Sequence, residues 1–236
     1  MSYVAYQDRV AANASVQERV DFIRLTYLHL GGAIAAFAAV CALMVNSPIG
    51  AKLTGFALGG PWNWLLVLGG FMLIGRVAEK WAMSGGSAGK HYLGLALYIV
   101  AQAVITVPLL YVAENFSGDP NVIKMAGLLT LVMFGGLTGT VFLTKKDFSF
   151  MGRGLQLASF GALGFILVGT IFGFGFGTFF ASAMVLLMAG YVLYSTSNVL
   201  RHYPIGSHVA ASLALFATIA TLFFYVLQLV MSASND

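Results

Sequence analysis

LTKKDFSFMG, at Leu143–Gly152, ends one long apolar segment of the chain and begins another. Lys145 and Lys146 stand in it beside a single acidic residue, Asp147, and Arg153 follows directly. Short loops on the cytoplasmic side of a membrane carry an excess of Lys and Arg. The stretch therefore predicts a cytoplasmic loop between two membrane spans, and with it a fold built from membrane-crossing helices.

The composition of the chain points to the same class of protein. Of its 236 residues, 59% are hydrophobic and 8% are charged, and the mean hydropathy is +0.89. Soluble domains carry about 25% charged residues, and a soluble fold of this length could not hide so much apolar surface in one core. We therefore expect an all-α integral membrane protein in contact with the lipid bilayer. The net charge of +4 is small and does not support nucleic-acid binding.

Seven apolar stretches approach the ~20 residues that a helix needs to cross the hydrocarbon core. Turn residues such as Pro48 and Pro61 separate them. The pattern predicts a polar cytoplasmic tail at residues 1–23, a seven-helix membrane domain at residues 24–231 and a short tail at residues 232–236. The expected spans are residues 24–45, 62–83, 91–113, 121–144, 152–172, 177–199 and 208–231.

Basic residues distinguish the two sides of the membrane. If all seven spans cross and the amino terminus is inside, Lys52 and Lys124 are the only two of the twelve Lys and Arg residues on the outer side. This asymmetry predicts a cytoplasmic amino terminus and an external carboxy terminus. Within the tail, residues 17–24 form either an amphipathic helix on the membrane surface or a solvated segment with a short turn.

Small residues recur within the expected spans. Faces made of Gly, Ala and Ser let the backbones of neighbouring membrane helices approach closely. We expect this packing role for most of the 28 glycines. The segments that suggest it are Gly31-Gly32, Gly69-Gly70, Gly135 to Gly139, Gly161 to Gly164 and Ala181 to Ala183.

Polar side chains inside membrane spans are costly, so they are candidates for function. Arg76, Glu79 and Lys80 share one face of the second expected span. They form either a charge cluster at the inner mouth of a cavity or an interfacial group whose basic side chains reach the membrane surface. His29 is expected to form a hydrogen bond near the interface rather than to bind a ligand. Cys41 is expected to be a buried thiol, and a single cysteine excludes an internal disulfide.

The last two expected spans carry most of the remaining polar groups. Five hydrogen-bonding side chains, residues 194–198, close the sixth span, and Ser212, Thr218, Thr221 and Gln228 follow along the seventh. If the two helices are neighbours, these side chains either line a narrow water-filled path or bond from helix to helix.

The inventory does not favour an enzyme. No pair of carboxylates, metal-ligand cluster or Ser–His–Asp arrangement can be assembled from the sequence. Glu79, and Glu114 at the outer edge, are the acids expected near membrane depth. We therefore expect no catalytic residue and no bound cofactor.

Three segments together resemble one membrane-protein family. They are FIRLTYLHL at residues 22–30, FGGL at 134–137 followed by TKKDFSFMG at 144–152, and YVLYSTSN at 191–198. In order and spacing the chain resembles the Bax inhibitor-1 family, also called the transmembrane Bax inhibitor motif family, and is most similar to its bacterial YccA-like branch.

The resemblance implies a fold and several activities. It implies a seven-helix bundle in which the last helix is surrounded by the others. Family members are associated with a pH-sensitive calcium leak, and eukaryotic relatives with suppression of cell death. The YccA-like branch is associated with binding and restraining a membrane-anchored ATP-dependent (AAA) protease. Likeness to that branch suggests the bacterial inner membrane as the location.

One departure from the family pattern matters for function. Calcium-leak members carry two acidic residues where this chain has Ser195 and Thr218, and an arginine that partners them corresponds to Arg76. Two close carboxylates would share a proton and sense pH, whereas hydroxyls do not titrate near neutral pH. We therefore expect that the pH switch has been lost.

Two hypotheses from different classes follow. The first is a leak pathway for Ca²⁺ or another cation, and its lining would be Ser195, Thr196, Asn198, Thr218 and Thr221. The second is a non-conducting partner of a membrane-anchored AAA protease, with the tail at residues 2–21 as the contact. Hydroxyl groups alone are poor ligands for a divalent cation, which weakens the first hypothesis.

Overall fold

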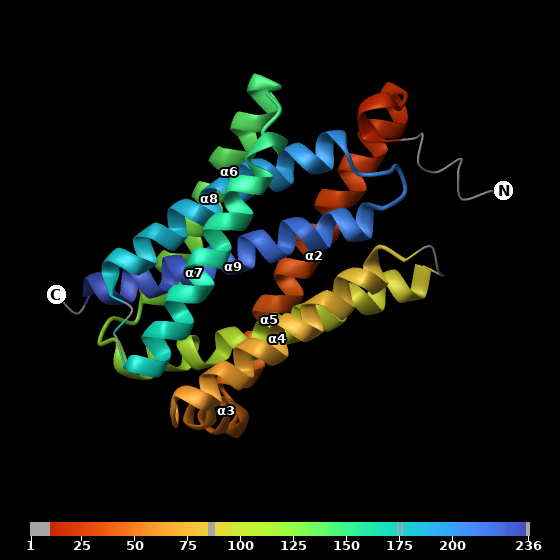
Figure 1. Cartoon of the computed structure of the whole chain (residues 1–236). Helices are drawn as coiled ribbons and strands as arrows, with labels where there is room; N and C mark the ends of the chain where they lie inside the picture. The colour runs from red at the N-terminus through yellow and green to blue at the C-terminus, as the bar shows by residue number, and fades with distance from the viewer. Residues whose placement is uncertain (1–9, 85–87, 174, 176, 235–236) are drawn as a thin grey trace.

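The described residues of the computed structural model are 10–84, 88–173, 175 and 177–234, and they form α-helices, two short 3-10 helices and no strand. The start of the expected tail, Gly85, Gly86 and the last two residues lie outside this range. Figure 1 shows the arrangement of the helices. They are η1 Ala11–Asn13, α2 Val16–Val45, α3 Pro48–Leu58, α4 Pro61–Ala82, α5 Ala88–Phe116, α6 Val122–Thr144, η2 Ser149–Met151, α7 Gly152–Phe172, α8 Thr178–Arg201 and α9 His208–Ser234.

Helix α2, which corresponds to the first expected span, begins about two turns before the expected start at residue 24. Ser15 ends the preceding segment, and its Oγ accepts a hydrogen bond from the Glu18 N–H at 3.3 Å. The Glu18 carboxylate in turn accepts the Ser15 N–H at 3.2 Å. This reciprocal capping box starts the helix at Val16. The polar residues 17–24 therefore continue directly into the first apolar helix.

A short helix, α3, lies in the gap between the first two expected spans. The Ser47 hydroxyl caps it by accepting the Ile49 N–H at 3.3 Å, and Pro48 occupies its first turn. Its 11 residues are too few to cross a bilayer, so the length of its apolar run does not mark it as a membrane span. At Gly59–Gly60 the chain bends by 113° into α4.

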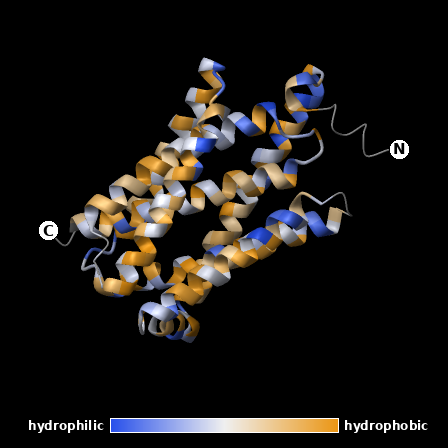
Figure 2. Cartoon of the chain, viewed as in Figure 1, coloured by the Kyte–Doolittle hydropathy of each residue, from blue (hydrophilic) through white to orange (hydrophobic). Residues whose placement is uncertain are grey.

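Six helices of the described chain are long and apolar enough to cross a membrane by themselves. Together α3 and α4, a bent pair, form a candidate seventh span. Figure 2 shows hydrophobic residues along the helices and hydrophilic ones gathered toward several helix ends. The expected all-α integral membrane bundle is confirmed, with six or seven spans.

Helix α9 lies in the middle of this bundle, as Figure 1 shows. It packs against α2, α4, α5, α6 and α8. Leu215, Phe216 and Leu222 are completely buried in it. The Phe216 ring meets Phe37 of α2 at 5.7 Å between ring centroids and Tyr98 of α5 at 6.1 Å. Aromatic side chains from three helices thus hold the central helix in place.

The bundle has two distinct ends, which we name by their contents. The loop end gathers the start of α2, residues 145–149 and residues 202–207, because the Ala11 N–H donates to the Tyr203 carbonyl at 2.9 Å and Arg201 donates to the Lys145 carbonyl. The α3 end gathers α3, the ends of α5 and α7 and the start of α8 around one cavity. Which end faces the cytoplasm stays a prediction from the charge pattern.

The expected role of the glycine faces is wrong for most of the segments that suggested it. A Cβ atom placed on Gly31, Gly69, Gly135 or Gly161 would have no atom within 4 Å. These positions face away from neighbouring helices in the single chain. Close approach occurs elsewhere: at Gly94 of α5, a Cβ would lie 2.6 Å from the Ala78 carbonyl oxygen of α4.

Candidate functional site

Ser195 of α8 and Thr218 of α9 form a buried hydrogen-bonded pair. Their hydroxyl oxygens are 3.2 Å apart, and the residues are 9% and 6% exposed. Thr218 Oγ1 also donates to the Ala214 carbonyl at 2.9 Å, so the hydrogen between the two hydroxyls comes from Ser195. The two positions singled out from the sequence are therefore neighbours. Each helix supplies one neutral hydroxyl at the contact.

Thr196 is directed toward a different helix. It is 1% exposed, and its hydroxyl oxygen is 3.4 Å from that of Thr138 on α6. The Tyr27 hydroxyl of α2 is buried beside these two threonines, yet within the described residues it has no partner at hydrogen-bonding geometry. Three helices thus contribute hydroxyl groups to one buried spot, which has unused hydrogen-bonding capacity.

Ser197 fastens the basic loop to the end of α8. Its hydroxyl donates to Asp147 Oδ1 at 3.0 Å and accepts the Phe148 N–H at 3.0 Å. Asp147 Oδ1 also accepts the Ser149 N–H at 2.9 Å. These hydrogen bonds, led by that from Ser149, lower the pKa of Asp147 to about 2. Ser197 is completely buried, and it was not among the site residues inferred from sequence.

Lys145, Arg201 and His202 make further contacts that hold this loop in place. Lys145 adopts a left-handed conformation, with φ of 54°, and its N–H closes α6 on the Val141 carbonyl at 3.1 Å. The guanidinium of Arg201 donates to the Lys145 carbonyl. His202 Nε2 lies 3.9 Å from Asp147 Oδ2. The segment at residues 143–152 therefore connects α6 to α7 along the chain and is fastened by hydrogen bonds to the end of α8.

The other inferred site residues do not join the Ser195–Thr218 pair. Arg76 and Glu79 are exposed on α4, near its end. Asn198 is half-buried, and its carbonyl accepts the His202 N–H at 2.7 Å. Thr221 is half-buried and lines a small cavity between α4, α5, α7 and α9. The expected pathway residues therefore divide among several surroundings.

His29 makes hydrogen bonds through both of its ring nitrogens. Its Nδ1 donates to the Leu25 carbonyl at 2.7 Å, because a carbonyl can only accept. In the neutral ring Nε2 then accepts from the Tyr92 hydroxyl at 3.1 Å. The ring also lies 4.9 Å from that of His208. In the part of the chain that the structure describes, no group of three His, Cys, Asp or Glu could hold a metal ion.

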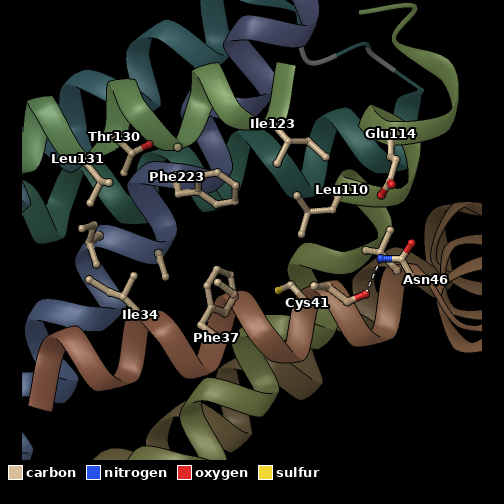
Figure 3. A pocket seen from close by; sticks show the side chains of 16 residues that line it. Ile34, Phe37, Cys41, Asn46, Leu110, Glu114, Ile123, Thr130, Leu131 and Phe223 are labelled. Carbon is tan, nitrogen blue, oxygen red and sulfur yellow. Dashed lines mark hydrogen bonds between the residues drawn. The ribbon is translucent and has the colours of Figure 1, made fainter. Parts of the chain in front are cut away.

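An apolar cavity of about 340 Å³ lies between α2, α5, α6 and α9. Figure 3 shows Phe37, Cys41 and Phe223 around it, with Asn46 and Glu114 at its edge. The expected burial of Cys41 is confirmed. A surface of this kind suits hydrocarbon rather than a hydrated ion.

Comparison with known proteins gives consistent matches. A family model described as "Inhibitor of apoptosis-promoting Bax1" matches residues 19–235. The Bax inhibitor 1 of Schizosaccharomyces pombe is 30% identical over 183 residues, which cover 73% of this chain and 64% of that protein. An uncharacterized protein of Pseudomonas aeruginosa is 30% identical over 129 residues, which cover 53% and 58%. A membrane protein of Vibrio cholerae is 28% identical over 134 residues, which cover 55% and 58%.

The chain spans less than two thirds of the length of each of these three relatives. No solved structure matches it.

Proposed function

The chain belongs to the Bax inhibitor-1 family, and on this premise we propose that it provides a leak pathway for calcium or another cation, without the family's acidic pH switch and without catalysis. The observation that carries the proposal is the buried hydrogen bond between Ser195 and Thr218. It joins α8 to the central helix α9 with uncharged groups. A pathway at this contact would be polar but would carry no titrating side chain.

The proposal makes a direct statement about pH. Two carboxylates about 3 Å apart cannot both ionise, so one of them takes up a proton near neutral pH and the pair responds to acidity. Two hydroxyls keep their protons throughout that range. The flux through this chain is therefore expected to change little between about pH 5 and about pH 8.

The test is calcium flux in liposomes that contain the purified chain and a calcium dye. We expect a pH-independent flux for the wild type and a steep pH response for the double variant Ser195→Asp/Thr218→Asp. The matched control, Ser195→Asn/Thr218→Asn, has side chains of similar size that do not titrate. It should stay independent of pH. This comparison separates the effect of charge from the effect of larger side chains.

Two results would contradict the proposal. A steep pH response of the wild type would mean that another group is the sensor, and Glu79 would be tested next. A wild type that admits neither calcium nor a monovalent cation at any pH would exclude the leak.

The second candidate is a regulatory partner of a membrane-anchored AAA protease. It is favoured by the first turns of α2, where Val16 is 82% exposed and Val20 is 52% exposed. Exposed apolar side chains on a polar helical extension suit contact with another protein. Val16→Ser/Val20→Ser keeps the Ser15 cap and removes this surface. Lost co-purification with the protease and unchanged flux would assign the extension to protein binding.

A further inference from the structure

Two adjoining cavities enter the bundle from the α3 end. The larger, about 560 Å³, is lined by residues of α3, α4, α5, α7, α8 and α9. The smaller, about 110 Å³, lies between α4, α5, α7 and α9. They share the side chains of Trp64, Ile166, Phe224 and Tyr225 as a common wall. Together they extend from the α3 end to the central helix α9.

Each cavity contains a buried polar atom that has no hydrogen-bond partner in the described structure. Gln102 of α5 lines the smaller cavity, is 2% exposed, and its Oε1 is unpaired. Thr170 of α7 lines the larger cavity, and its Oγ1 is also buried and unpaired. Leaving such groups without a partner costs free energy, so they indicate bound water or a polar ligand. A volume of 110 Å³ has room for about three water molecules.

The chemistry of the inner cavity suits a monovalent cation. Thr221 lines it as well, and because its hydroxyl donates to the Ala217 carbonyl at 2.8 Å, its lone pairs are directed elsewhere. No Asp, Glu, Lys or Arg is among the described residues that line either cavity. Divalent calcium is usually bound with the help of carboxylates. Neutral oxygens with aromatic rings nearby, such as those of Trp64 and Tyr225, are compatible with a single positive charge.

We propose that the two cavities form a water-filled vestibule and that Gln102, with Thr221, holds a partly hydrated monovalent cation at its inner end. The role of this site as part of a leak rests on the proposed function. Thr221 lies one turn from Thr218 on α9. A cation held with the help of Thr221 would thus contact α9 one turn from the residue that bonds to Ser195. The apolar cavity around Cys41 lies elsewhere in the bundle and provides an internal control.

Access to the vestibule is tested by labelling cysteines in lipid nanodiscs. Cys41→Ala removes the single native cysteine, and Thr170→Cys or Gln102→Cys is then added. We expect both positions to react with the cationic reagent 2-(trimethylammonium)ethyl methanethiosulfonate. Their reaction with the anionic reagent 2-sulfonatoethyl methanethiosulfonate should be slower. The wild type, whose Cys41 lies in the apolar cavity, should react with neither. Reaction with an uncharged maleimide alone would mean that lipid fills the vestibule and would overturn the proposal.

Cation binding is tested by thermal unfolding in potassium chloride and in choline chloride at equal ionic strength. A ligand that binds the native state raises the unfolding temperature. We expect potassium to stabilise the wild type, and Gln102→Leu to lose this response. Gln156→Leu makes the same change at an exposed position of α7, and this variant should keep the stabilisation by potassium. An equal response in Gln102→Leu, or a larger one with calcium, would contradict the site.

These measurements do not depend on flux. If the vestibule is labelled and potassium binds but the liposomes admit no cation, the leak fails and the site stands. If the liposomes conduct and Gln102→Leu changes neither potassium binding nor the rate of potassium entry, the leak stands and the site fails.

Discussion

At the scale of single residues, Asp147 shows how one side chain organises the segment that marks the chain. Its carboxylate accepts hydrogen bonds from the Ser149 backbone and the Ser197 side chain. Ser197 is buried, so the bond ties an accessible loop to the interior of α8. The positive-inside rule accounts for the lysines beside Asp147. The hydrogen bonds that Asp147 accepts account for an acidic residue at this position.

The lowered pKa of Asp147 gives a pH prediction whose sign follows from the shift. The pKa falls from an ordinary 3.8 to about 2 in the folded chain, so the stabilising contribution is complete above about pH 4 and is lost as the pH falls through about 2. Asp147→Asn should therefore lower the unfolding temperature at about pH 7 and flatten its decline between about pH 4 and about pH 2. Asp119→Asn, at the other end of the bundle, controls for loss of one carboxylate. A decline as steep in Asp147→Asn as in the wild type would contradict the prediction.

At the scale of elements, the contact between α4 and α5 depends on one glycine. Gly94 is buried, and the space beside its Cα is occupied by the backbone of α4 at Ala78 and Ala82. A backbone cannot swing away as a flexible side chain can. The two helices therefore pack at a distance that only glycine permits.

Gly94→Ala should destabilise the chain because the added methyl group would lie 2.6 Å from the Ala78 carbonyl oxygen. Overpacking of this kind costs about 1–3 kcal/mol. Gly69→Ala is the matched control: it lies within α4, where an added Cβ meets nothing within 4 Å, and alanine favours a helix by about 0.5–1 kcal/mol. Thermal unfolding should move in opposite directions for the two variants. A loss of stability in Gly69→Ala equal to that in Gly94→Ala would mean that the α4–α5 contact is not the cause.

At the scale of the whole molecule, the fold gathers basic side chains at one end. One cavity there is lined by Arg19 of α2, Lys145, Lys146 and Arg201, whereas Lys52 lies in α3 at the other end. From the positive-inside rule we predict that the loop end faces the cytoplasm. The fold defines the two ends of the bundle, and the charge pattern predicts which of them faces the cytoplasm.

This orientation can be tested in intact cells with a thiol reagent that does not cross membranes. In a Cys41→Ala background, Lys52→Cys should be labelled from outside, whereas Lys146→Cys should be labelled only after the membrane is opened. Both replaced residues are exposed lysines, so the comparison is matched for access to water. The opposite pattern would reverse the assignment, and equal labelling of both would show mixed orientation.

The sequence alone determined the class of the protein, the approximate positions of its long helices and the family likeness. These follow from hydrophobic runs of membrane length and from turn residues between them, which act locally along the chain. It also placed Ser195 and Thr218 together, through the resemblance. It did not predict α3, because a mostly apolar stretch of 11 residues that begins at a proline and contains Lys52 is too short for a helical period to stand out.

Only the tertiary structure decided which face of each helix meets a neighbour. The glycine-rich segments at Gly31 and Gly161 have the composition of packing faces but meet nothing, whereas Gly94 makes the close contact. Gln102 and Thr170 likewise carry no distinguishing local pattern, and the polar run at residues 194–198 does not show which of its members meets the basic loop. In a chain that is hydrophobic on all sides, periodicity cannot separate surfaces that face lipid from surfaces that face protein. That choice comes from the fit between helices far apart in the sequence.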